Sequence, residues 1–203
     1  MSDAGVRQRV DGRTLRAERT RQAITDAHFA LLEEGELRPT AERIAERAGV
    51  SLRALWTNFK DMEGLFAAAG ERLMERQRAE FRPVPTELPL PERIERYCAQ
   101  RARLLELIAP AARAARIREP FSAQLRKNRA WYLEIAREEI ETLFAPELAS
   151  AGQARREVLD ALTVAATFAG WSMWRDELHL DVAGATAVLR RMVTALLPAG
   201  ATA

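Results

Sequence analysis

Apolar residues recur at helical spacing along nearly the whole chain, and this periodicity is the strongest constraint on its fold. Leu, Ala, Arg and Glu dominate, and no segment shows sustained alternation of β-branched residues. Strands are therefore not expected. With 203 residues, of which 48% are hydrophobic, the chain can form a real core. The pattern predicts an all-α protein of about nine helices.

Prolines and glycines divide this helical pattern into two parts. Four prolines between Arg82 and Pro91 break helical structure outright. Residues 1–13 are charged, lack an apolar run and are expected to form a disordered basic tail. The predicted helices span residues 15–34, 41–48, 52–58, 61–80, 91–108, 110–118, 120–144, 154–177 and 182–197.

Few residues in this chain suit metal or covalent chemistry. Cys98 is the only cysteine, which excludes an internal disulfide and a cysteine-based zinc site. The only histidines are His28 and His179, neither follows a glutamate by three residues, and no nucleotide-binding or hydrolase motif is present. We expect no metal, no cofactor and no catalysis.

The N-terminus has no apolar signal-peptide core, and the longest uncharged run, residues 161–174, is shorter than a membrane span. A cytoplasmic protein without a membrane partner is the expectation. All basic residues except Lys60 and Lys127 are arginines, and the formal net charge is +2. Arginine suits phosphate contacts, but salt-bridged helix faces explain the same bias.

Residues 40–60 carry the most informative pattern, namely two short helices joined by a turn. Thr40 and Ser51 are expected N-caps, and Gly49 suits the left-handed conformation that ends the first helix. Ala45 is small where the two helices must cross closely. Four apolar residues are expected to form a small core with the first long helix: Ile44, Val50, Leu55 and Phe59. This arrangement predicts a helix-turn-helix.

The run AERIAERAGVSLRALWTNFKDMEGLF, residues 41–66, resembles the DNA-binding signature of the TetR family of bacterial transcriptional regulators. The motif covers about the first third of the chain, and length and helix number agree over the rest. In that family a Gly-Val-Ser turn leads into a recognition helix that ends in an aromatic residue, a polar residue and Phe. The positions that match in residue or in kind are Gly49, Val50, Ser51, Leu55, Trp56, Asn58, Phe59, Glu63 and Leu65. This sequence has Ala54, Trp56, Asn58 and Met62 where the family usually has Thr, Tyr, His and Lys, and these differences fall on the contact surface.

The second short helix is expected to enter the major groove of double-stranded DNA. Arg53 is the best candidate for a bidentate contact to guanine, which would contribute ~1–3 kcal/mol of discrimination. Arg7, Arg9 and Arg13 in the tail suit either a minor-groove arm or a solvated tail. The predicted DNA-contacting residues are Thr40, Arg43, Ser51, Leu52, Arg53, Ala54, Trp56, Thr57, Asn58 and Lys60.

The resemblance also implies a homodimer in which the last two helices of each copy form a four-helix interface. Such two-fold pairing would present two recognition helices ~34 Å apart. The candidate interface residues are Leu162, Ala165, Ala169, Met173, Leu189, Met192, Val193 and Leu196.

Members of the family commonly sense a small molecule in the C-terminal bundle, which implies an apolar or amphipathic effector here. A plain hydrophobic core explains most of the same residues. The helix of residues 61–80 would transmit the signal. The candidate pocket residues are Tyr97, Cys98, Arg101, Leu105, Asn128, Trp131, Ile135 and Phe168.

Together these features predict transcription regulation by a repressor that binds a palindromic operator as a dimer and is released by its effector. Residues 14–60 would form the DNA-binding domain, and residues 61–203 the ligand-binding and dimerisation domain. The alternatives are a ligand-independent or architectural DNA-binding protein and, less favoured, a helical-bundle enzyme.

Overall fold

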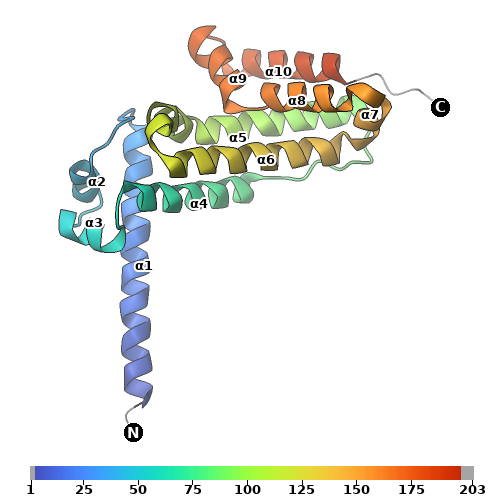
Figure 1. Cartoon of the computed structure of the whole chain (residues 1–203). Coiled ribbons are helices and arrows are strands. Elements are labelled where there is room, and N and C mark those ends of the chain that lie inside the picture. The colour runs from blue at the N-terminus through green and yellow to red at the C-terminus, as the bar shows by residue number, and fades with distance from the viewer. Residues whose placement is uncertain (1–2, 198–203) are drawn as a thin grey trace. The chain divides into compact units, whose positions relative to one another are not determined.

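In a computed structural model of the chain, residues 3–197 are described, apart from the side chains of residues 3–11 and 13. This part of the chain forms ten α-helices and no strand, which confirms the all-α prediction (Figure 1). The α-helices are α1 (Asp3–Glu33), α2 (Ala41–Arg47), α3 (Leu52–Asn58), α4 (Met62–Glu80), α5 (Leu90–Arg118), α6 (Ala123–Leu143), α7 (Ala145–Ser150), α8 (Arg155–Ala165), α9 (Phe168–Ser172) and α10 (Val182–Leu196).

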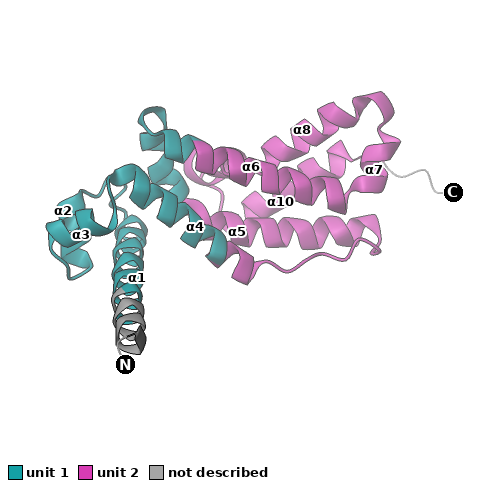
Figure 2. Ribbon diagram, turned by 60° about the horizontal axis from the view of Figure 1, so that its bottom comes forward, with its two compact units in different colours: residues 1–75, 110–126 teal, residues 76–109, 127–203 magenta. Residues whose placement is uncertain are grey.

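The chain divides into two compact units (Figure 2). Unit 1 contains residues 1–75 and 110–126, and unit 2 contains residues 76–109 and 127–203. Helices α4, α5 and α6 therefore each contribute residues to both units. The functional division at residue 60 stays a prediction.

Unit 1 is built around a small closed core between α1, α2, α3 and the start of α4. Every side chain in this core is at most 3% exposed, because four short apolar surfaces meet on one another. Its buried members are Ile24, Leu31, Ile44, Ala45, Leu55, Phe59 and Leu65.

Unit 2 has the larger core, to which α5, α6, α7, α8 and α10 contribute (Figure 1). Its aromatic centre includes Tyr97 and Phe144, whose rings meet edge to face at 5.4 Å. Beside it, Arg93 and Glu147 form a buried ion pair at 2.5 Å. Arg93 also donates to the carbonyls of Leu88 and Leu143, so the pair is embedded in hydrogen bonds.

Helix α1 begins at Asp3 rather than at residue 15, so Thr14 lies inside it. Residues 3–14 contain no proline, and glycine costs only ~1 kcal/mol within a helix, so nothing blocks the earlier start. The side chains of Arg7, Arg9 and Arg13 lie outside the described residues.

Helix α5 continues through Pro110, so the separate helix predicted for residues 110–118 is wrong. A proline removes one hydrogen bond, but the alanines that flank Pro110 favour helix on both sides. The next helix, α6, begins at Ala123 instead of Pro120. The Ser122 hydroxyl caps its start by accepting a hydrogen bond from the Leu125 N–H at 3.1 Å.

The helix predicted for residues 154–177 is split into α8, α9 and a π-helical turn, Met173–Glu177. The break lies at Thr167, which is extended and whose hydroxyl donates to the Val164 carbonyl at 2.8 Å. A Cβ atom at Gly170 would lie 3.2 Å from that carbonyl, so glycine permits the tight turn. None of the helices between residues 3 and 197 is both long and apolar enough to cross a membrane.

Candidate nucleic-acid interface

Helices α2 and α3 form the predicted helix-turn-helix. The Thr40 hydroxyl accepts from the Arg43 N–H at 3.3 Å, and the Ser51 hydroxyl accepts from the Ala54 N–H at 3.1 Å. Gly49 has φ +67°, and the Val50 N–H closes the turn onto the Ala45 carbonyl at 3.0 Å. Both N-caps and the left-handed glycine are therefore confirmed.

The burial of one side of α3 determines which of its side chains can contact a ligand. Leu55 is fully buried and Phe59, directly after the helix, is 2% exposed. Because residues near the helical period share a face, this burial leaves the opposite side of α3 outward. The exposed residues on and around it are Ser51, Leu52, Arg53, Trp56, Thr57 and Lys60.

Two predicted contact residues of α3 are turned toward its own backbone. Asn58 is half-buried, and its amide donates to the Ala54 carbonyl at 2.8 Å. The Thr57 hydroxyl donates to the Arg53 carbonyl at 2.8 Å. These bonds complete the last turn of α3, so Asn58 contributes more to the helix end than to the exposed surface.

Arg21 of α1 contacts the end of α3, and the sequence analysis did not predict this contact. Its guanidinium donates to the Asn58 carbonyl at the C-terminal end of α3 and lies 4.4 Å from the centre of the Phe59 ring. A cation at this end of a helix stabilises it and fixes its direction. The two residues lie 37 positions apart, and no local motif links them.

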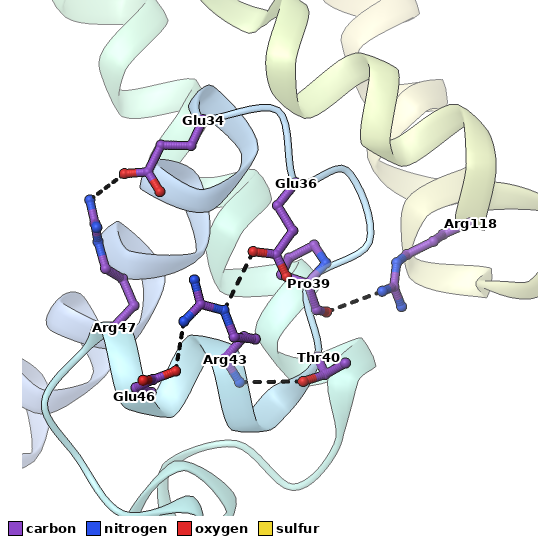
Figure 3. Close-up of polar contacts among 8 residues, drawn as sticks. All are labelled: Glu34, Glu36, Pro39, Thr40, Arg43, Glu46, Arg47 and Arg118. Atoms are coloured by element: carbon purple, nitrogen blue, oxygen red, sulfur yellow. Dashed lines mark hydrogen bonds and ion pairs between the residues drawn. The ribbon is translucent and has the colours of Figure 1, made fainter.

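The arginines of α2 are held by carboxylates (Figure 3). Arg43 lies 2.6 Å from Glu46 and 3.6 Å from Glu36, and Arg47 lies 2.6 Å from Glu34. The Glu46 carboxylate raises the pKa of Arg43, since its hydrogen bond and charge favour the cation. The positive charge of α2 is thus balanced within unit 1.

The N-terminus of α2 also faces a carboxylate. The pKa of Glu42 is lowered, first by a hydrogen bond from its own backbone N–H and then by one from Thr40. By contrast, Arg53 and Lys60 are exposed and form no ion pair within the part of the chain that the structure describes. Arg53 and Lys60 therefore supply uncommitted positive charge on and just after α3.

Four of the predicted pocket residues in unit 2 lie in its closed core or pack against it. Tyr97, Cys98 and Leu105 are each at most 3% exposed within the closed core, and Phe168 packs against that core. Arg101 is ion-paired with Glu139. A surface hollow of about 230 Å³ in this unit contains none of the predicted residues. It is lined by Arg82, Pro83, Val84, Pro85, Arg96, Ala99, Gln100 and Arg103.

Burial also controls the chemistry of this core. Burial raises the pKa of Tyr97, and it raises the pKa of the Cys98 thiol to about 12. Among the described residues, the Tyr97 hydroxyl has no hydrogen-bond partner, and the Arg101 guanidinium lies 5.6 Å from the centre of its ring. The remaining candidates, Asn128, Trp131 and Ile135, share a helical spacing on α6 and are half-buried or exposed.

The predicted interface residues fall into two groups. Four of them are buried in the core of this chain, so their side chains are not available to a second copy: Leu162, Ala165, Leu189 and Val193. Ala169, Met173 and Met192 are exposed, and Leu196 is half-buried. Val164, 64% exposed on α8, extends the apolar surface but was not predicted.

No protein-family model matches the chain, and no curated protein matches it either. Among solved structures, a transcriptional regulator from Rhodococcus sp. Rha1 is similar, with a TM-score of 0.65 and 19% sequence identity. The similarity covers 89% of this chain and 95% of the regulator. Over most of its length, this chain therefore has the fold of that regulator.

Proposed function

We propose that this protein is a DNA-binding transcriptional regulator of the TetR type, a repressor that binds a palindromic operator as a homodimer. The observation that carries the proposal is the difference between the arginines of α2 and α3. Arg43 and Arg47 are paired with carboxylates, whereas Arg53 is exposed on the outward face of a capped helix without an ion pair among the described residues. The regulator from Rhodococcus with the same fold supports this assignment.

The chemistry of α3 suits base recognition in the major groove. The Arg53 guanidinium can donate two hydrogen bonds to one guanine. Leu52 and Trp56, 36% and 38% exposed, lie one turn apart and offer apolar contact to thymine methyl groups. Phosphate contacts would come from Ser51, Lys60 and the N-terminus of α3.

Selection of bound duplexes from a random DNA library tests this proposal. The intact protein should enrich a palindromic motif, and Arg53→Gln should weaken binding to that motif by about 5- to 150-fold, as loss of one base contact predicts. Arg156→Gln is the matched control, since it removes the same charge from an exposed side chain of unit 2. Equal losses in both variants, or no motif for the intact protein, would refute the assignment.

The dimer would use the exposed apolar residues of α8, α9, the following π-helical turn and α10. Val164, Met173 and Met192 are 64%, 53% and 38% exposed, so their side chains are accessible to a second copy. Sedimentation velocity should show a dimer at micromolar concentration. Met192→Glu should shift the protein toward monomer, whereas Thr194→Glu in the same helix serves as the control for added charge.

The effector is proposed to be apolar or amphipathic and to bind in unit 2. The closed packing of Tyr97, Cys98 and Leu105 favours a second candidate, a regulator that binds DNA without a ligand. Thermal denaturation with a panel of apolar compounds separates the two, because a ligand of the native state raises the melting temperature by mass action. A compound that stabilises the protein should also weaken operator binding if it is an effector.

A further inference from the structure

We infer that Arg118 is a positioning residue for the helix-turn-helix. Arg118 lies in the last turn of α5 and holds the loop between α1 and α2. Residues 110–126 therefore help to position the helix-turn-helix of unit 1. This inference rests on the proposed function and adds to it a residue far from the DNA-binding motif in sequence.

The first observation is a hydrogen bond to the residue that precedes the helix-turn-helix. The Arg118 guanidinium donates to the Pro39 carbonyl at 3.2 Å, across 79 residues of sequence (Figure 3). Pro39 is buried and directly precedes Thr40, whose hydroxyl caps α2. Because proline has a fixed φ, holding its carbonyl also restricts the direction in which the chain enters α2.

The second observation is the aromatic contact beneath the guanidinium. Arg118 lies 5.9 Å from the centre of the Phe66 ring of α4, and Phe66 lies 6.2 Å from the His28 ring of α1. Phe66 and His28 are each 6% exposed. The Arg118 guanidinium therefore contacts a buried aromatic pair that joins α1 to α4. This cation–π contact limits the positions that the guanidinium can take.

The third observation is independent of Arg118. The Glu63 carboxylate, in the first turn of α4, accepts from the Gln124 N–H at the start of α6 at 2.8 Å. Ala114 and Ser122 of the same segment are 6% and 3% exposed. Residues 110–126 are thus attached at two separate points to the elements that surround α2 and α3.

These contacts predict a local effect on α2. The Ile44 N–H donates to the Thr40 carbonyl at 3.0 Å, so the first hydrogen bond of α2 depends on the position of Thr40. If Arg118 no longer holds Pro39, this turn should open more often. Arg21 still fixes the end of α3, so the fold of unit 1 should be kept while the two helices of the motif lose their fixed relation.

Amide hydrogen exchange of the full chain tests the positioning role without DNA. Arg118→Met keeps the aliphatic stem but removes the donors, and exchange in α2 should become about tenfold faster, the change expected for one lost charge-assisted hydrogen bond. Arg118→Lys keeps a charge and a donor and should recover most of the protection. Arg126→Met is the matched control, since among the described residues the Arg126 guanidinium hydrogen-bonds only to carbonyls of its own segment.

Operator binding tests the functional half of the inference. Arg118→Met should bind the selected duplex about tenfold more weakly than Arg126→Met, which has the same net charge, and Arg118→Lys should bind nearly as well as the intact protein. If amide exchange in α2 is equally fast in Arg118→Met and Arg126→Met, the inference is overturned, whatever their affinities for the duplex. Unequal exchange with equal DNA affinity overturns the role of Arg118 in binding. An intact protein that selects no duplex refutes the proposed function instead.

Discussion

Arg93 and Arg101 of unit 2 and Arg53 of unit 1 lie in opposite environments. In unit 2, Arg93 and Arg101 are almost completely buried and each is paired with a glutamate. In unit 1, Arg53 is exposed on α3 and has no ion pair among the described residues. Burial and partner, rather than residue type, therefore separate an arginine that stabilises the protein from one that can contact a ligand.

The buried pair of unit 2 should give the largest effect. Arg93→Met leaves Glu147 buried without its partner, and such a change lowers the free energy of unfolding by about 3–5 kcal/mol. Urea unfolding measures this loss. Arg190→Met, whose partner Glu95 is 57% exposed, should lower the free energy of unfolding far less, because water screens an exposed ion pair. Comparable losses in both variants would contradict the contrast between buried and exposed arginines.

Unit 1 has its own buried ionisable group, His28, which is kept neutral. Burial, with a smaller contribution from the charge of Arg118, lowers the pKa of His28 from 6.5 to about 4. Because the unfolded chain binds the proton more readily, stability should fall as the pH drops from 6.5 to about 4, by up to about 3 kcal/mol. The stability of the intact protein should therefore depend on pH in this window.

Replacing His28 isolates this contribution. His28→Gln should flatten the pH dependence of the free energy of unfolding, measured by urea unfolding at a series of pH values. His179→Asn is the control, because His179 is exposed and has φ +53°, which asparagine tolerates. If His28→Gln keeps the slope of the intact protein, His28 is not the group that titrates.

The turn of the helix-turn-helix depends on backbone conformation rather than on side-chain contacts. A Cβ atom at Gly49 would meet nothing within 4 Å, but its φ of +67° is unfavourable for other residues. Gly49→Ala should therefore cost about 1–2 kcal/mol in unfolding experiments. Gly64→Ala, within α4, should instead stabilise by up to about 1 kcal/mol. If Gly49→Ala left the free energy of unfolding unchanged, the turn would have to adopt another backbone conformation at no cost.

The carboxylates around Arg43 should give the smallest effect. Glu46→Gln removes the nearer of the two carboxylates at Arg43 and leaves only Glu36, at 3.6 Å, so the guanidinium can contact phosphate more readily. Affinity for any duplex should therefore rise a few-fold, and the salt dependence should steepen by up to about one unit of log–log slope. Titrations at several salt concentrations measure both quantities. Glu138→Gln, in the exposed part of α6, is the control for a lost negative charge.

Local signals in the sequence predicted most of the fold, but not the contacts that connect distant segments. Thr40, Gly49 and Ser51 are recognisable because a cap or a left-handed residue acts within a few positions. Pro110 misled the prediction, since flanking alanines override a single proline within α5. Thr167 and Gly170 lie in an apolar run whose helical period hid the break between α8 and α9.

In the candidate site, too, local features could be predicted from the sequence, whereas contacts between distant residues could not. The outward position of Arg53 follows from the helical period once Leu55 and Phe59 are placed in the core. The contacts of Glu36 with Arg43 and of Glu34 with Arg47 join residues whose distance in space no periodicity specifies. The same holds for the contacts of Arg21 and Arg118. The burial of Leu162 and Leu189 likewise depends on how the helices of unit 2 pack, which apolar spacing alone leaves open.

The return of the chain to unit 1 at residues 110–126 has a consequence for synthesis on the ribosome. Arg118 and Gln124 are made about 80 and 60 residues after the groups they contact, so a nascent helix-turn-helix lacks these partners while the first helices of unit 2 emerge. Unit 1 can be completed only when residue 126 has left the exit tunnel. A fragment that stops at residue 75, or a chimera that exchanges only the first third of the chain, would carry the helix-turn-helix without the segment that contacts the start of its first helix.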